Sequence, residues 1–245
     1  MDLSEIKRRT KERKKDYIMP IYLPFLPMIL TIVTAFLGVL SVLGWFALGF
    51  RPDIGLGAGI TAAIVIVLVA IISAVLWIYV LYKWIDRRNK HFKRVELLYQ
   101  DLIDFLEDKG AKNEAKTARR TLREMASETD EKSPALWIIL TIVLSPVIFY
   151  VYHFLSNDFK KHENKENFLI EDITDAIEAA GGSFKFQEYN AIENRNTILY
   201  IVLTIITLGI FGLYWIYTLT KDPNKHFRQS AKMEEKLINS LEALE

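Results

Sequence analysis

The sequence predicts an all-α fold: a polytopic membrane protein with four transmembrane helices, an amphipathic cytoplasmic helical hairpin and a C-terminal amphipathic helix. The chain of 245 residues is 51% hydrophobic and has a mean hydropathy of +0.15, yet 25% of its residues are charged. Apolar and charged residues must therefore occupy separate segments. Residues 18–50 and 54–82 contain no Asp, Glu, Lys, Arg or His, and each run is longer than the about 20 apolar residues that cross a bilayer.

Two shorter uncharged runs, residues 134–152 and 197–220, complete the four predicted spans. The first run contains Pro20, Pro24 and Pro27, and because proline is tolerated in the first turn of a helix, that span starts near Pro27. The predicted segments are a basic cytoplasmic N-terminus (1–17), a transmembrane hairpin (18–85, with spans about 27–50 and 57–82), a cytoplasmic helical hairpin (86–133), a third span (134–156), an external polar helix and loop (157–196), a fourth span (197–220) and a cytoplasmic amphipathic helix (221–245).

The distribution of basic residues predicts the orientation. Residues 7–15 carry seven positive charges and one negative charge, which keeps the N-terminus in the cytoplasm under the positive-inside rule. Residues 83–132 hold 13 Lys and Arg against 11 Asp and Glu, whereas residues 157–196 hold 5 against 9. The second polar loop is therefore predicted to be external. Both termini of this multi-pass cell-membrane protein are predicted to be cytoplasmic.

One junction recurs three times: a long apolar segment ends in aromatic residues and runs into a Lys-His pair. The three pairs are Lys90-His91, Lys161-His162 and Lys225-His226. The tyrosines twelve residues before each histidine are Tyr79, Tyr150 and Tyr214. This recurrence predicts three copies of one unit, a membrane helix continued by a polar helix. Aromatic and basic residues at such a junction are typical of the membrane interface. The predicted interface collar comprises Tyr79, Lys90, His91, Tyr150, Lys161, His162, Tyr214, Trp215, Tyr217, Lys225 and His226.

The polar segments have the periodicity of helices. Between residues 92 and 106, apolar residues recur at steps of three and four, the spacing of a coiled-coil seam, and Gly110 ends the run. We interpret residues 86–133 as a helical hairpin that packs on itself, and the alternative is a stalk that pairs with another subunit. Residues 183–189 alternate aromatic and polar side chains, which predicts a short strand. Residues 233–244 predict an amphipathic helix that docks or lies on the membrane surface.

The repeat and the predicted topology conflict, because four spans place the middle junction on the opposite side of the membrane from the other two. Each of the last two apolar segments contains helix-breaking residues near its centre, Ser145 and Pro146 in one, Gly209 and Gly212 in the other. Two alternatives follow. Kinked helices that cross the membrane are favoured. Segments that bend back as re-entrant hairpins are the second alternative, and such backbone survives at membrane depth only when it is buried in protein.

The fourth apolar segment carries a specific motif, a Thr-x-Gly-Ile-aromatic-x-x-Tyr-Trp-x-Tyr run that leads into Lys-Asp. Its positions are Thr207, Gly209, Ile210, Phe211, Tyr214, Trp215, Tyr217, Lys221 and Asp222. This motif resembles a family of small prokaryotic membrane proteins known as domain of unknown function 4234, best over residues 196–227. Residues 135–162 resemble a degenerate copy, which keeps Tyr150 but has Ser145-Pro146 where the glycine belongs. The resemblance implies a membrane location and a prokaryotic origin, and it assigns no reaction.

The sequence contains no catalytic constellation. The predicted spans hold no ionisable residue in their interiors, although pumps and proton-coupled transporters need one. The absence of cysteine excludes disulfides and thiolate sites. The four histidines, His91, His153, His162 and His226, show neither His-x-x-x-His nor a Glu-linked spacing, so we predict no metal, no cofactor and no enzymatic activity. His91 and His226 converge if the repeated units pack together, but solvated histidines that face headgroups are the favoured expectation.

These observations predict an integral membrane scaffold or accessory subunit that oligomerises, or binds a partner, through its spans and helical arms. The alternative is a small oligomeric transporter or channel with kinked pore-lining helices. The expected partners are a bilayer with anionic headgroups and either further copies of the chain or another membrane protein. A formal net charge of +1 argues against nucleic acid.

Overall fold

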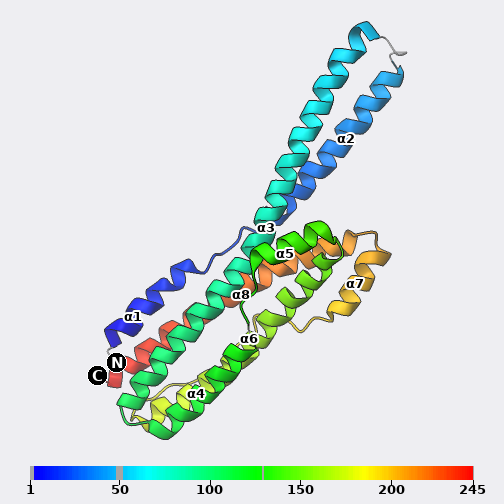
Figure 1. Cartoon of the computed structure of the whole chain (residues 1–245). Helices are drawn as coiled ribbons and strands as arrows, with labels where there is room; N and C mark the ends of the chain where they lie inside the picture. The colour runs from blue at the N-terminus through cyan, green and yellow to red at the C-terminus, as the bar shows by residue number, and fades with distance from the viewer. Residues whose placement is uncertain (1–2, 48–51, 129, 245) are drawn as a thin grey trace. The chain divides into compact units, whose positions relative to one another are not determined.

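The computed structural model describes residues 3–47, 52–128 and 130–244. All regular structure in these ranges is helical, so the described residues contain no strand. The helices run in the order α1 (Leu3–Lys11), η1 (Glu12–Lys15), η2 (Leu23–Phe25), α2 (Leu26–Ala47), α3 (Pro52–Asp108), α4 (Lys112–Ser127), α5 (Pro134–Val143), α6 (Val147–Ala179), α7 (Thr197–Ile206), α8 (Ile210–Leu241) and η3 (Glu242–Leu244) (Figure 1).

The chain divides into two compact units. Residues Pro20–Lys83 form the hairpin unit, and Met1–Met19 together with Trp84–Glu245 form the bundle unit. Helix α3 contributes its first part to the hairpin unit and its remainder to the bundle unit.

The hairpin unit contains the helices with the length and composition of membrane spans. These are Leu23–Ala47 and the apolar first part of Gly59–Asp108, and they support membrane association. The Thr31 and Ser73 hydroxyls lie 2.8 Å apart, and the Ser73 hydroxyl donates to the Pro27 carbonyl at 2.7 Å. The buried Ser73 hydroxyl thus finds its partners within the hairpin. The end of the first predicted span, residues 48–50, lies outside the described residues.

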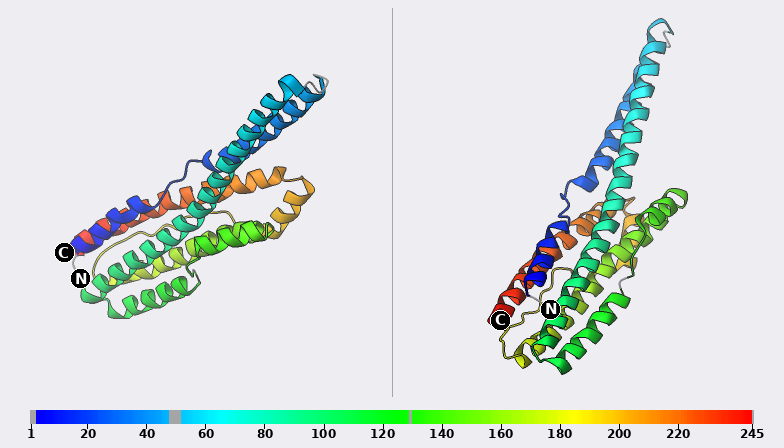
Figure 2. Two further views of the ribbon diagram at one scale, coloured as in Figure 1. Left: turned by 45° about the horizontal axis from the view of Figure 1, so that its top comes forward. Right: turned by 60° about the vertical axis from the view of Figure 1, so that its left-hand side comes forward.

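The bundle unit is organised by three parallel helices, α3, α6 and α8 (Figure 2). The Trp84 ring of α3 lies 5.8 Å from the Tyr152 ring of α6, and fifteen residues later on α3 the Tyr99 hydroxyl donates to Glu166 of α6. On α8 the matching partners are Thr220, which accepts from Trp84 Nε1, and Glu234, which pairs with Arg94. Because the three helices keep one register, equivalent positions of each face the same layer of the core.

The apolar stripes read from the sequence form the core of this unit. Helix α4 packs on α6, where Thr121 donates to Asp172 and Lys165 pairs with Glu124. Residues of α1, α3, α4, α6 and α8 share one buried cluster, and the stripe positions within it are Val95, Tyr99, Leu102, Leu106, Ala115, Ala118, Leu122, Met125, Ile173, Ile177, Met233, Leu237 and Leu241. The predicted seam is therefore buried by the chain itself, which supports the self-packed arrangement rather than a stalk. The C-terminal helix docks on this core as the end of α8.

The third and fourth apolar segments reverse direction instead of running straight. Trp137 of α5 lies 5.2 Å from the rings of Tyr150 and Phe154 of α6, although a straight helix would hold these residues about 20–25 Å apart. Tyr200 of α7 lies 5.5 Å from Trp215 of α8 in the same way. The breakers lie at the reversals: Pro146 directly precedes α6, and Gly209, at φ 94°, directly precedes α8. Two helices have the length and composition of a membrane span, whereas α5 and α7 have only 10 residues each, so four spans are not established.

Residues 157–196 belong to the same core as the other polar segments. Leu169, Ile173 and Ile177 of α6 share the core cluster with α3, α4 and α8. The external position of residues 157–196 stays a prediction, and the shared core is the observation that bears on it. The strand predicted at 183–189 does not form, because these residues have no ladder partners. The segment contacts α6 through its side chains instead.

A pair of cysteines introduced into the cysteine-free chain tests the reversal between α7 and α8. A Cβ placed at Gly212 meets Thr204 Cγ2 at 3.2 Å, whereas eight residues along a straight helix separate two Cα atoms by about 12 Å. We expect the double variant Thr204→Cys, Gly212→Cys to form a disulfide, since the required Cβ separation is about 3.8 Å. Loss of free thiols, counted by maleimide labelling and mass spectrometry, measures it.

The control pair is Leu213→Cys with Lys221→Cys, which are also eight residues apart but lie on one helix, α8. This pair is expected to remain reduced under the same oxidation. Equal thiol counts for both pairs would contradict the helical reversal.

Candidate functional site: a buried histidine cluster

The three Lys-His pairs place their lysines outside and their histidines inside. Lys90, Lys161 and Lys225 are exposed, whereas the three histidines retain at most 1% exposure. Adjacent residues on a helix point about 100° apart, so each lysine turns outward when its neighbouring histidine turns to the core. The predicted solvated histidines of a headgroup collar are therefore wrong. Because α3, α6 and α8 are parallel and in register, the histidines meet at one level of the bundle.

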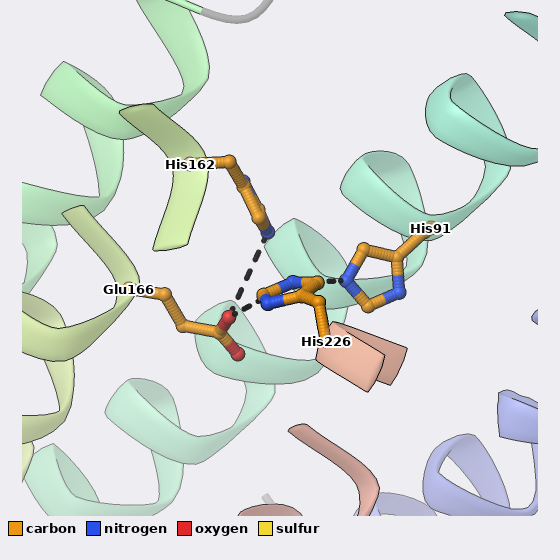
Figure 3. Close-up of side chains that lie close together, drawn as sticks. All are labelled: His91, His162, Glu166 and His226. Carbon is orange, nitrogen blue, oxygen red and sulfur yellow. Dashed lines mark hydrogen bonds and ion pairs between the residues drawn. The ribbon is translucent and has the colours of Figure 1, made fainter. Parts of the chain in front are cut away.

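His91, His162, His226 and Glu166 form the centre of the site, which we term the histidine cluster (Figure 3). The Nε2 atoms of His91 and His226 lie 3.0 Å apart. Glu166 Oε2 lies 3.6 Å from His226 Nε2 and 3.8 Å from His162 Nε2. One potential ligand atom from each of the four residues lies within 4.8 Å of the others, and all four residues are buried.

Two carboxylates hold the outer nitrogens of two of these rings. His91 Nδ1 lies 3.0 Å from Asp16 Oδ2, and His226 Nδ1 lies 3.2 Å from Glu163 Oε2. Burial raises the pKa of Asp16, but His91 and Arg94 outweigh burial and bring that pKa to about 2. Burial also raises the pKa of Glu163, and the bonds from His226 and from the backbone N–H groups of Ile192 and Ala191 lower it overall. Both carboxylates are therefore ionised acceptors at neutral pH.

His91 and His162 are neutral at physiological pH. Burial lowers the pKa of His91 to about 4, although the attraction of Asp16 opposes the shift. Burial also lowers the pKa of His162 well below its usual value, and the nearby His91 and His226 add to this effect. Neither ring nitrogen of His162 has a hydrogen-bond partner among the described residues. Its ring stacks on Phe92 with centroids 4.0 Å apart.

Glu166 is fixed by three hydroxyl groups from three different parts of the chain. The Tyr99 hydroxyl of α3 donates at 2.9 Å and the Ser230 hydroxyl of α8 at 3.1 Å, both to Oε1. The Tyr189 hydroxyl, from the extended segment after α6, donates to Oε2 at 2.5 Å. Burial and the neighbouring Glu166 charge raise the pKa of Tyr99 and of Tyr189, so both keep their protons and act as donors.

Arg94 links the cluster to a further buried acid. Its Nη2 atom donates to both Asp16 Oδ2 and Glu234 Oε1 at 2.7 Å. Burial lowers the pKa of Arg94, but Glu234 and Asp16 outweigh it, so that its pKa is raised. Burial raises the pKa of Glu234 in spite of Arg94. Through Asp16, the segment that follows α1 and η1 becomes part of the site.

The other predicted collar residues divide between surface and core. Tyr79, Tyr150 and Tyr214 are exposed, and Tyr217 is half-buried with Lys221 Nζ 5.4 Å from its ring centroid. Trp215 is fully buried and donates from Nε1 to Ser156 Oγ at 3.1 Å. Its prediction as an interface anchor is therefore wrong, because α8 turns that ring toward α6.

The predicted helix-breaking residues lie at the two reversals. Ser145 and Pro146 form the exposed turn between α5 and α6. Gly209 adopts φ 94°, a conformation that residues with a Cβ rarely adopt. Gly212 is buried where Thr204 of α7 approaches α8. These residues shape the hairpins and do not contribute to the histidine cluster.

Five charged residues of the site were not predicted from the sequence: Asp16, Arg94, Glu163, Glu166 and Glu234. Only Glu166 has a sequence spacing that could have indicated its place in the site. His162 and Glu166 are four residues apart on α6 and therefore share one helix face, a spacing compatible with two ligands to one ion. The other four resemble solvated surface charges until the tertiary packing buries them.

The donor set suits a metal ion. Imidazole and carboxylate groups, here three and one, are ligands of divalent transition metals such as Zn²⁺. The carboxylates behind His91 and His226 match the outer partners that orient metal-bound histidines. His153, the fourth histidine, lies apart and contacts Thr197 at 2.6 Å.

Comparison with known families supports the motif at the C-terminal end of the chain. Residues 195–241 match the family model described as Domain of unknown function (DUF4234). This confirms the resemblance predicted from the motif around Tyr214 and Trp215. The matched segment contains α7 and α8, and with them His226, Ser230 and Glu234. No curated protein and no solved structure matches the chain.

Substitution of Asp16 tests the electrostatic construction of the site. Asp16→Asn keeps the side-chain shape but removes the charge that faces His91 and Arg94. The Arg94 side chain is itself only 4% exposed. Breaking a buried ion pair costs about 3 kcal/mol, which lowers the apparent Tm of a chain of this size by about 5–10 °C. Thermal unfolding of the detergent-solubilised protein, followed by circular dichroism, measures the shift.

The matched control is Glu5→Gln. Glu5 pairs with Arg8 at 3.2 Å on the exposed face of α1, and its loss is expected to cost less than about 0.5 kcal/mol. A Tm shift for Asp16→Asn no larger than that of Glu5→Gln would contradict the role assigned to Asp16.

Proposed function

We propose that the protein is an integral membrane scaffold or accessory subunit, which crosses the bilayer with α2 and the first part of α3 and inserts the α5–α6 and α7–α8 reversals as re-entrant hairpins. The observation that carries this proposal is the exposed apolar surface at the two reversals of the bundle unit. The residues that form these two tips are Ile142, Val143, Leu144, Ile205, Ile206, Leu208 and Ile210, each at least 56% exposed.

The tip of the α7–α8 hairpin supports lipid as its environment. Leu208 is 94% exposed and adopts φ 50°, a left-handed conformation that costs a non-glycine residue about 1 kcal/mol or more. Exposure of a leucine side chain to water contributes no favourable free energy that would offset this backbone strain. Burial of a leucine side chain in hydrocarbon contributes about 2 kcal/mol, which offsets the strain.

The backbone of this turn supports the same assignment. At membrane depth every N–H group needs an internal partner. The N–H groups of Thr207, Leu208, Gly209 and Ile210 donate to carbonyls of Leu203, Ile205, Thr204 and Thr207 respectively. The next one, Phe211 N–H, donates to the Thr207 hydroxyl at 2.9 Å. The turn therefore presents apolar side chains without unpaired donors.

The lengths of α5 and α7 fit insertion to half the bilayer. Helices of 10 residues each measure about 15 Å, and the hydrocarbon core measures about 30 Å. Near the base of the α7–α8 hairpin, Arg195 pairs with Asp222 at 2.7 Å and donates to the Tyr200 and Tyr214 hydroxyls. A basic residue with tyrosine hydroxyls is typical of the headgroup level.

The orientation follows from the common core of the polar segments. Residues 86–133, 157–196 and 221–245 contribute to one core, which supports a common side, and the basic N-terminal segment favours the cytoplasm for that side under the positive-inside rule. The exposed basic residues Lys116, Arg120 and Arg123 of α4 then face the cytoplasm, where a partner protein meets them. We favour the scaffold over the transporter alternative, because that alternative assumed kinked spans that line a pore, whereas the last two apolar segments reverse.

Spin labels at single introduced cysteines test hairpin insertion. In proteoliposomes, a nitroxide at Leu208→Cys is expected to collide with O₂ and to be shielded from a polar nickel chelate, because it lies in hydrocarbon. The matched control, Ser183→Cys, is exposed in the extended segment after α6 and is expected to show the opposite accessibility. Equal access of the nickel chelate to both labels would refute insertion.

Thiol labelling in intact cells tests the common side of the polar segments. Ser183→Cys and Asn113→Cys, an exposed position on α4, are both expected to be protected from an impermeant maleimide until the cells are lysed. Labelling of position 183 but not of position 113 in intact cells would restore the four-span topology.

A further inference from the structure

We propose that the histidine cluster binds one divalent first-row transition metal ion, of the Zn²⁺ type, through Nε2 of His91 and His226, a ring nitrogen of His162 and a carboxylate oxygen of Glu166. The ion joins α3, α6 and α8 at one level of the bundle. This inference goes beyond the scaffold function, and it stands on the geometry of the cluster.

The contact between His91 and His226 requires a cation. Each ring presents Nδ1 to a carboxylate, at 3.0 Å from Asp16 and 3.2 Å from Glu163. An ionised carboxylate accepts hydrogen bonds, so Nδ1 is the donor of each ring. Both Nε2 atoms then present lone pairs to one another at 3.0 Å. Two acceptors do not bond to each other, but a metal ion between them accepts both lone pairs.

His162 identifies the cation as a metal rather than a shared proton. A proton between His91 and His226 satisfies those two rings only. His162 is fully buried, neither of its nitrogens has a hydrogen-bond partner among the described residues, and it points into the cluster (Figure 3). An unpartnered buried polar group costs about 1–3 kcal/mol. A ring nitrogen of His162 can direct a third lone pair at the point between His91 and His226, as a metal ligand does.

Three of the separations are close to those of a metal site. Zn–N bonds of about 2.05 Å in tetrahedral geometry place neighbouring ligand atoms about 3.3 Å apart. The separations of 3.0 Å between the His91 and His226 nitrogens, and of 3.6 and 3.8 Å from Glu166 to His226 and His162, bracket that value. The four ligand atoms lie within 4.8 Å of one another, so the side chains would move inward by up to about 1.5 Å to close a tetrahedron.

The charge balance of the site favours a cation. Four buried carboxylates lie in or near the cluster, Asp16, Glu163, Glu166 and Glu234, whereas two basic side chains pair with them, Arg94 and Lys160. Arg87, one turn before His91 on α3, is also buried, and it donates to Asn224 and to the Leu219 carbonyl. Pro223 has no N–H group, which frees that carbonyl for Arg87. With Arg87 counted, the carboxylates still exceed the basic side chains by one, and a metal cation offsets this excess of negative charge.

The second coordination layer is complete. Asp16 and Glu163 fix the tautomers of His91 and His226, as outer carboxylates do for metal-bound imidazole. Tyr99, Tyr189 and Ser230 donate to Glu166, which holds the carboxylate in place and leaves one lone pair of Oε2 toward the histidines. The bundle thus orients the proposed ligands before the ion binds.

The test uses the full chain, purified in detergent without chelator and then incubated with Zn²⁺ or Co²⁺ and desalted. We expect one ion per chain by elemental analysis. The Co²⁺ form is expected to show the intense visible absorption of four-coordinate cobalt. Folded protein that retains no ion, or Co²⁺ with only the weak absorption of six-coordinate cobalt, would overturn the proposal.

The chain offers a matched pair of histidine variants. His162→Leu removes one proposed ligand without breaking a hydrogen bond, so the protein is expected to fold, as checked by circular dichroism, but to bind Zn²⁺ more than about 100-fold more weakly. His153→Leu removes the histidine outside the cluster and is expected to bind as the parent does. Asp16→Asn, an outer-partner change, is expected to weaken binding by about 10- to 100-fold. Unchanged affinity in His162→Leu would contradict the assignment.

Discussion

The bundle unit depends on one constraint, the burial of three histidines at a single level between α3, α6 and α8, together with four carboxylates at and near that level. Buried charges require partners, and each partner here comes from a different element: Asp16 from the segment after η1, Tyr99 from α3, Tyr189 from the extended segment after α6 and Ser230 from α8. The network fixes the register of the three helices, since a shift by one residue would turn each histidine away and bring a lysine into the core.

The same register places both reversals at one end of the bundle unit. Because α6 and α8 are parallel and in register, their N-termini lie at one end, and both reversals that precede them occur there. In the arrangement that we propose, the apolar tips lie in lipid and the polar core is enclosed by protein. Pro146 and Gly209 lie near the centres of the last two apolar segments, and the helix that follows each of them carries a histidine of the cluster.

Much of the fold could be predicted from periodicity, and the site could be predicted only in part. The stripes through Leu102 and Leu122 indicated buried helix faces, because spacing of three and four residues reports one face directly. The recurrence of the Lys-His pair indicated a shared role for His91, His162 and His226, but burial depends on which helices pack together. A breaker such as Ser145-Pro146 is compatible with a kink or a reversal, and only tertiary contacts, such as that of Trp137 with Tyr150, decide between them. Asp16 lies 75 residues before His91, beyond the reach of any local pattern.

X-ray absorption spectroscopy of the Zn²⁺-loaded full chain tests the central claim most directly, because it reports the ligands of the ion itself. The account predicts four nitrogen or oxygen ligands at about 2.0–2.1 Å, with the outer-shell scattering of three imidazole rings. A spectrum without histidine scattering, or with the six oxygen ligands of a hydrated ion, would contradict the view that the three junction histidines converge on a metal.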